Sequence, residues 1–317
     1  MNDLQLGINL WSQAAAWDEM VDAARRVDRL GYDSLWTWDH LYAIFGDPHQ
    51  PILEGYAVVT AWAMATERVR LGLMVGANTF RNPGLVAKAI ATLDHVSAGR
   101  AVLGLGGAWF ELEHQAHGID FGSGFGQRLD WLDEAVAACR TLLDGGTVTS
   151  SPGGHYAFRE LRHAPRPVQA HLPIMIGGTG RRKTLRTLAR YGDEWNGEGS
   201  PQELGELVEV IAAHGREAGR DVSGIRRTAN IWMVIRDDPA EARRVWAAQM
   251  AHNTMPLADS IESDIRPLLG PVEYVAEVLA DYVAHGIPGA IVELPAPYDT
   301  ETLERLIGEV KPLVDAA

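Results

Sequence analysis

Short β-type runs alternate with longer helical runs along this chain of 317 residues, and this alternation most constrains its fold. Leu4–Leu10 has the composition of a strand. Asp18–Leu30 then repeats apolar residues at helical spacing. Asp18 is expected to cap the start of this helix, and Gly31 is expected just after its end. Ser34–Thr37 reads as the next strand, so the chain begins with a β-α-β unit.

The same alternation continues to the last residues and gives eight predicted strands, each followed by helical sequence. Repeated β-α units predict a parallel sheet covered by helices, and eight of them favour a closed (β/α)8 TIM barrel over an open doubly wound sheet. We therefore expect one barrel domain over residues 1–317. The predicted strands are Leu4–Leu10, Ser34–Thr37, Val69–Val75, Ala101–Leu105, Ile174–Ile176, Glu194–Trp195, Ala229–Ile235 and Ala290–Leu294.

One segment interrupts the pattern after the fourth predicted helix, Gln127–Leu143. Thr147–Gln169 is rich in turn residues, and Pro152-Gly153-Gly154 has the composition of a hairpin tip. We expect an insertion, about residues 147–170, that projects from the barrel as a hairpin.

Charge and composition exclude several classes of partner. Acidic residues outnumber basic ones by 42 to 28, a net charge of -14, which argues against a duplex nucleic-acid binder. The longest apolar stretch, Tyr56–Ala65, is broken by Thr60, whereas a membrane helix needs ~20 residues. The first residues show no signal peptide, so a cytoplasmic location is expected. The single cysteine, Cys139, lies on the apolar face of a predicted helix and reads as core.

In a parallel barrel, functional side chains gather where the strands run into the loops that follow them. Here those positions carry glycines, aromatic residues and a few titratable groups, which together suit a planar ligand with a phosphate. The candidate residues are Trp11, Trp38, Asp39, His40, Met74, Val75, Gly76, Asn78, Gly106, Gly107, Ala108, Trp109, Gly177, Gly178 and Thr179.

Two glycine-rich turns follow predicted strands, and each allows two interpretations. Gly177–Gly180 precedes a helix expected near Arg181, so its amides suit phosphate; the alternative is a turn that needs positive φ. Gly104–Gly107 lacks the third glycine of a dinucleotide fingerprint. Its glycines either let a flat ring approach the backbone or allow tight packing.

Two groups of titratable residues could carry chemistry. Asp39-His40 places a carboxylate beside an imidazole, which suits proton exchange near neutral pH; the alternative is an N-cap and a structural histidine. Glu111, Glu113, His114 and His117 do not have the spacing of a known zinc motif. A solvated helix start is the favoured interpretation there, and no metal site is predicted.

These segments resemble the bacterial-luciferase-like superfamily, and within it the branch that uses 8-hydroxy-5-deazaflavin, coenzyme F420. The resemblance covers nearly the whole chain, although relatives that use FMN share much of it. The matching segments are Gly31–Trp36 with Asp39-His40, Val69–Gly72 with Thr79–Pro83, Ala91–Asp94 with Ser97–Gly106, and Pro173–Gly178 with Tyr191–Asp193.

The resemblance implies a barrel with an insertion, often dimeric, with the cofactor ring at the strand carboxyl ends. It implies a non-prolyl cis peptide at Met74-Val75 behind the ring, and it places Asp39 and His40 where relatives contact the cofactor and handle a proton. Some relatives also use a glutamate after the fourth strand, where this chain has Trp109.

The implied reaction is hydride transfer between the deazaflavin and a small organic substrate, for which Trp11 and Trp38 are candidate contacts. A separate flavin or deazaflavin reductase would supply reduced cofactor, and a homodimer is expected. Two alternatives stay open: an FMN-dependent monooxygenase, and a non-catalytic barrel that only binds a flavin or another ligand.

Overall fold

The computed structural model describes residues 4–262 and 266–317. Within them, eight parallel strands close into a barrel, because β1 pairs with both β2 and β10 and β10 also pairs with β8. The barrel strands are β1 (Gln5–Leu10), β2 (Ser34–Thr37), β3 (Arg70–Leu73), β5 (Ala101–Gly106), β6 (Ile174–Gly177), β7 (Glu194–Gly197), β8 (Arg226–Ile235) and β10 (Gly289–Leu294).

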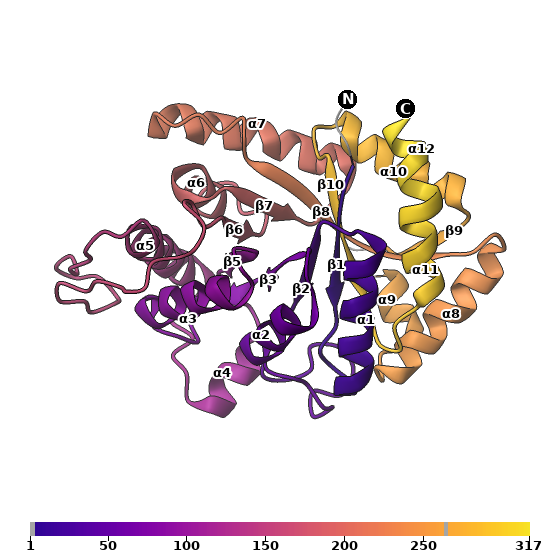
Figure 1. Ribbon diagram of the computed structural model, residues 1–317, viewed down its shortest axis with the longest axis horizontal. Helices are drawn as coiled ribbons and strands as arrows, with labels where there is room; N and C mark the ends of the chain where they lie inside the picture. The colour runs from indigo at the N-terminus through magenta and orange to yellow at the C-terminus, as the bar shows by residue number, and fades with distance from the viewer. Residues whose placement is uncertain (1–3, 263–265) are drawn as a thin grey trace.

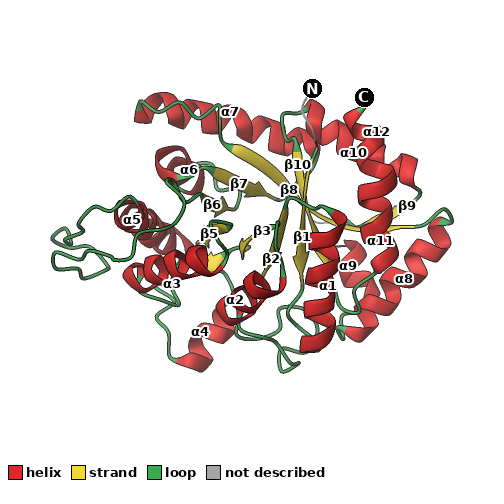
Figure 2. Cartoon of the chain, in the orientation of Figure 1, coloured by secondary structure: helices red, strands yellow, loops and turns green. Residues whose placement is uncertain are grey.

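Helices cover the outside of the strands, as Figures 1 and 2 show. The two ends of the described chain lie side by side, where the Leu4 amide donates to the Asp315 carboxylate at 2.7 Å. The helices are α1 (Trp17–Leu30), α2 (Gly55–Ala65), α3 (Pro83–Val96), α4 (Glu111–His117), α5 (Phe125–Leu143), α6 (Thr184–Tyr191), α7 (Pro201–Ala218), α8 (Pro239–His252), α9 (Leu257–Glu262), α10 (Val272–Ala284), α11 (Thr300–Arg305) and α12 (Lys311–Asp315), with a π-helical turn η1 (Leu306–Val310).

The first helix shows how closely local sequence sets an element. Gly31 ends α1 in the left-handed region, with φ of 90°, as expected from its position. The expected cap at Asp18 is wrong, because the N-cap residue is Ala16, whose side chain makes no capping hydrogen bond. Asp18 instead lies in the first turn, where a negative charge interacts favourably with the helix dipole.

The third predicted strand is divided in two. β3 ends at Leu73. A short strand, β4 (Gly76–Ala77), then pairs with the carboxyl end of the same neighbour, β5. Between them lies a cis peptide bond joining Met74 to Val75. A second short strand, β9 (Leu268–Gly270), pairs with the end of β8.

The segment between α5 and β6 forms loops that extend to the left in Figure 2. The expected hairpin is present in a short form: Val148 and Leu161 make one antiparallel bridge, and the Ser150 amide donates to the Phe158 carbonyl at 3.1 Å. The segment is held on the barrel by Tyr156, which packs on Trp131 of α5 and donates its hydroxyl to the Asn78 carbonyl at 2.8 Å.

Cys139 is fully buried on α5, among the residues of the main core. Burial raises the pKa of its thiol to about 12, so the thiolate is not populated near neutral pH. The expectation that Cys139 is a core residue is therefore confirmed. No described helix has the length and apolar character that crossing a membrane requires.

Candidate active site

Asp39 is placed at the end of β2, but it does not act on His40. Its carboxylate is 3% exposed and accepts two hydrogen bonds from Arg81, at 2.7 and 3.0 Å, and one from the Ala77 amide at 2.9 Å. Arg81 in turn reaches Glu54 at 2.7 Å. The interpretation of Asp39-His40 as a carboxylate–imidazole pair is therefore wrong: the bidentate ion pair with Arg81 uses the carboxylate to fix the strand ends.

The carboxylate that does pair with His40 is Glu113, on α4. The His40 Nδ1 and Glu113 Oε1 atoms are 2.9 Å apart, and the second Glu113 oxygen accepts from the Leu41 amide at 2.8 Å. The Glu113 side chain is 1% exposed and that of His40 15%. A buried carboxylate on Nδ1 favours the tautomer with hydrogen on Nδ1, which leaves Nε2 to accept a proton.

The expectation of a solvated helix start at Glu111–His117 is therefore only partly correct. Glu111 is exposed, as expected, but Glu113 and His114 are buried. His114 contacts the Thr79 hydroxyl at 2.7 Å and the Phe110 carbonyl at 2.8 Å. Within residues 4–262 and 266–317, no group of three histidine, cysteine, aspartate or glutamate side chains is placed to hold a metal ion.

A helical signal in the sequence could have identified Glu113. Residues two positions apart on a helix point to nearly opposite faces, so Glu111 and Glu113 cannot both be solvated when the helix packs on a barrel. His114, next to Glu113, shares the buried face. The partner of Glu113 was not readable, because His40 is 73 positions away in the chain.

Trp11 and Trp38 lie at the strand ends as expected, but both are buried. Their ring centroids are 4.7 Å apart, and Trp11 also stacks on Phe45 at 4.7 Å and meets Trp232 edge-on at 5.8 Å. We call Trp11, Trp38, Phe45 and Trp232 the aromatic wall. Trp38 alone of these four meets His40, with ring centroids 6.3 Å apart and planes nearly perpendicular.

The Val75 side chain explains two of the glycines at the strand ends. A Cβ added to Gly106 would lie 2.6 Å from Val75, and one added to Gly177 would lie 2.8 Å from it. Tight packing therefore requires glycine at both positions, without any ligand. Met74 is buried and Val75 is half-buried. The Val75 side chain therefore supplies the accessible surface next to Gly106 of β5 and Gly177 of β6.

Gly76 and Asn78 lie inside the structure. A Cβ at Gly76 would be 2.9 Å from the Gly104 carbonyl oxygen. Asn78 is 2% exposed, and its carbonyl holds Tyr156 of the inserted segment. Both residues support the strand ends, and the Asn78 side chain presents no open surface.

The open part of this end of the barrel follows β5. Gly107 and Ala108 are half-exposed, and Ala108 has a φ of 52°. Trp109 is 57% exposed, and Phe125 at the start of α5 is 52% exposed. Uncovered backbone beside exposed aromatic rings fits a planar apolar group such as a flavin or deazaflavin ring.

The turn after β6 offers less to a phosphate than expected. Gly178 has a φ of 113°, and its amide already donates to the Asn196 carbonyl at 3.0 Å. Positive φ therefore accounts for glycine here. The helix begins at Thr184 and not near Arg181, so half-exposed Thr179 and Gly180 lie before it in an open turn.

Only part of the positive charge at this turn is free for an anion. Lys183 is bound to Asp130 at 2.7 Å and to the Gly126 carbonyl at 2.8 Å. Arg181 lies 3.8 Å from Glu206. Arg182 is exposed and has no acidic partner within the described residues. A phosphate at this turn would therefore meet Thr179 and Arg182.

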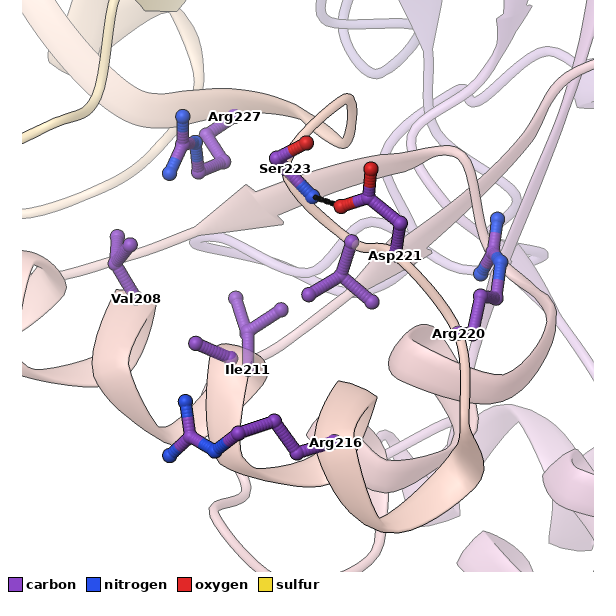
Figure 3. Close-up of a pocket in the computed structure, with 9 residues that line it drawn as sticks. Val208, Ile211, Arg216, Arg220, Asp221, Ser223 and Arg227 are labelled. Atoms are coloured by element: carbon purple, nitrogen blue, oxygen red, sulfur yellow. Dashed lines mark hydrogen bonds between the residues drawn. The ribbon is translucent and has the colours of Figure 1, made fainter.

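A separate cavity of about 320 Å³ lies away from all these residues, between α7 and the start of β8. Figure 3 shows its apolar floor and the arginines around it. The start of β8 is at the amino-terminal end of the barrel, opposite His40, so this cavity is not the candidate active site. Its lining is Val208, Ile211, Ala212, Arg216, Arg220, Asp221, Val222, Ser223 and Arg227.

The sequence of this chain matches the family model of the luciferase-like monooxygenases over residues 5–269. The chain belongs to this family. It is 30% identical to an F420-dependent glucose-6-phosphate dehydrogenase of Kineococcus radiotolerans, over 98% of this chain and 97% of that protein.

Two further comparisons show a partial sequence match and a shared fold. An uncharacterized protein of Mycobacterium tuberculosis is 31% identical over 55% of this chain, and the match spans 60% of that relative's length. A solved F420-dependent secondary alcohol dehydrogenase, in complex with an F420-acetone adduct, superposes with a TM-score of 0.83. That superposition covers 98% of this chain and 99% of the other, at 22% identity, and it shows the shared barrel fold.

Proposed function

We propose that this chain is an F420-dependent oxidoreductase that transfers a hydride between the deazaflavin and a small organic substrate. The observation that carries the proposal is the His40–Glu113 pair at the strand carboxyl ends. A buried carboxylate that fixes an imidazole beside an open, aromatic-edged surface suits proton transfer next to a planar cofactor. The full-length similarity to an F420-dependent dehydrogenase supports the choice of cofactor.

When bound, the deazaflavin supplies the hydride chemistry, and the chain supplies binding and proton transfer. In the oxidative direction, His40 Nε2 takes the hydroxyl proton of an alcohol as its carbon loses a hydride, which gives a carbonyl product. Glu113 holds the imidazole in the accepting tautomer and stabilises the imidazolium that forms. In the reductive direction, His40 returns the proton to the carbonyl oxygen.

The residues proposed to hold the cofactor ring form the surface after β3, β5 and β6. Met74, Val75 and Gly76 would lie behind the ring, Gly106 to Trp109 would border it, and Gly177 to Thr179 would face its phosphate-bearing side chain. Asp39 contributes indirectly, because it ties Arg81 and the Ala77 amide to the same strand ends.

The alternative is an FMN-dependent monooxygenase, which the name of the matched family favours. The two are separated by supplying either F420 or reduced FMN, each with a panel of short alcohols, aldehydes and ketones. We expect loss or gain of the deazaflavin's visible absorbance without oxygen uptake. Oxygen uptake with reduced FMN, together with no change in F420, would support the monooxygenase instead.

We also infer that the chain works as a homodimer, with a separate reductase supplying reduced cofactor when the substrate is reduced. Met64 on α2 and Leu85 on α3 are 76% and 67% exposed, which supports an apolar contact on these adjacent helices. Light scattering is expected to give twice the monomer mass, and Met64→Lys to lower it. A monomeric wild type would contradict the dimer.

A further inference from the structure

Beneath the aromatic wall lies a buried carboxylate that the proposed reaction does not use. Glu293 is on β10, at the position that pairs with Asn9 of β1 and Trp232 of β8, and it is 3% exposed. One of its oxygens, Oε2, accepts from both the Asn9 side-chain amide and the Trp11 indole N–H, each at 2.7 Å. The Glu293 carboxylate therefore binds at least one indole of the aromatic wall.

Two more side chains face Glu293. The Trp38 indole and the Asn230 side chain lie near the carboxylate and, like the hydrogen bonds from Asn9 and Trp11, favour its charged form. Burial outweighs these four and raises the pKa of Glu293 to about 7. The indole of Trp11 is thus bound to an acid whose pKa lies near neutral pH, and the Trp38 indole lies beside the same acid.

Within residues 4–262 and 266–317, no arginine, lysine or histidine forms an ion pair with Glu293. The side chains next to it are neutral: Asn9, Trp11, Asn230 and Trp232. Two titratable groups contact these tryptophans: Tyr298 donates to the main-chain carbonyl of Trp11 at 2.7 Å, and His40 meets the Trp38 ring. Asp39, the residue after Trp38, is neutralised by Arg81.

Two orphaned atoms indicate where a proton on Glu293 would go. The side-chain oxygens Oδ1 of Asn9 and of Asn230 are buried and have no hydrogen-bond partner. An ionised carboxylate can only accept hydrogen bonds, whereas the protonated acid can also donate one. The charged form is therefore matched by the N–H groups, and the protonated form by an amide oxygen that otherwise stays unsatisfied.

We propose that Glu293 is a positioning residue, whose carboxylate holds the Trp11 indole, on which the Trp38 ring packs, and so fixes the wall against which His40 packs. When Glu293 takes up a proton, one oxygen turns from an N–H acceptor into a donor to Asn9 or Asn230, and an indole is released. Its effect on catalysis rests on the proposed function, but its hydrogen bonds and its titration can be measured in the ligand-free protein.

The test is a pH titration of the protein labelled with ¹⁵N-tryptophan, from pH 5 to 9, following the indole N–H resonances. Trp11→Phe and Trp38→Phe assign the two signals. We expect both to move with one shared midpoint near pH 7, and Glu293→Gln to abolish the movement of both. His40→Asn removes the imidazole and should leave the Trp11 titration unchanged, because Trp11 does not meet His40.

A matched control removes a different interior carboxylate. Glu194, on β7, pairs with Arg70 at the opposite end of the barrel from the two indoles. Glu194→Gln should therefore leave both indole titrations as in the wild type. Indole signals that do not move with pH in the wild type would overturn the proposal, whether or not Glu293→Gln folds. If the indole signals still move with pH in Glu293→Gln but no longer move in His40→Asn, the movement comes from the imidazole. That result would also overturn the proposal.

The catalytic consequence has its own readout. Glu293→Gln should raise KM about tenfold and change kcat less than threefold, because the wall loosens while the His40–Glu113 pair stays intact. An unchanged KM would restrict Glu293 to a structural role. If F420 is not bound at all, the indole titration still decides the proposal, so its failure and that of the proposed function are distinguishable.

Discussion

Two carboxylates lie inside the barrel, at opposite ends, and they are compensated in different ways. At the amino-terminal end, Glu194 forms an ion pair with Arg70, and Arg226 lies nearby. At the carboxyl end, Glu293 accepts hydrogen bonds from an amide and an indole N–H and has no cationic partner among the residues that the structure describes. A charge neutralised by a cation stabilises the fold, whereas a buried charge held by dipoles keeps a raised pKa and can respond to its surroundings. This difference separates the end of the barrel that supports the fold from the end proposed to carry the chemistry.

The largest expected effect is at the carboxyl end. His40→Ala should lower turnover ~10²–10⁴-fold, the usual loss for one positioned acid or base, with little change in melting temperature. Single-turnover hydride transfer and thermal unfolding on the same preparation measure both. A normal rate per folded molecule would make His40 structural and remove the distinction between the two ends.

Glu113→Gln should have the next largest effect. The amide keeps the size of the side chain but no longer stabilises an imidazolium, so we expect a rate loss on the order of 10²-fold. Single-turnover hydride transfer measures the rate. A wild-type rate in Glu113→Gln would mean that Glu113 does not act on His40.

Glu194→Gln tests the amino-terminal end. It leaves the Arg70 guanidinium without its acid, and because Arg70 is partly solvated we expect a loss of about 2–3 kcal/mol in the free energy of unfolding. The rate per folded molecule should be unchanged. Denaturant unfolding and turnover check the two halves of this prediction; a selective loss of rate would contradict it.

Glu293 should give stability a pH dependence of opposite sign to an ordinary paired acid. Its pKa is raised from 4.5 to about 7, so between these values the folded protein binds a proton that the unfolded chain has released. The stabilisation is therefore present below pH 4.5 and is lost as the pH rises through 7.

Glu293→Gln removes this dependence. Relative to the wild type, the variant should gain stability from pH 5 to pH 8, by up to about 3 kcal/mol at 1.36 kcal/mol per pKa unit. Chemical denaturation at the two pH values measures it. A difference between variant and wild type that does not depend on pH would mean that Glu293 keeps one protonation state throughout.

The sequence predicted the barrel well because its signals are local. Apolar spacing and Gly31 mark α1 within one residue, and Ser34–Thr37 has the bounds of β2. The division of the third strand at Met74 and the bridge from Val148 to Leu161 depend on pairing with distant segments, so local patterns do not show them.

The site was predicted in position but not in its contacts. His40 and Asp39 lie at the strand ends, as expected, yet their partners are Glu113 and Arg81, which are distant in sequence. Trp11 was expected to contact the substrate and is fully buried, because four aromatic rings pack on one another there. Which carboxylate meets which base depends on how the loops fold over the barrel.

The most direct test of the central claim is equilibrium binding of F420 and of FMN to the same ligand-free protein, followed by the fluorescence of each cofactor. The account predicts saturable binding of F420 at least tenfold tighter than that of FMN. It also predicts that His40→Ala leaves the F420 affinity nearly unchanged, because backbone and aromatic surfaces hold the ring. Tighter binding of FMN than of F420 would contradict the account.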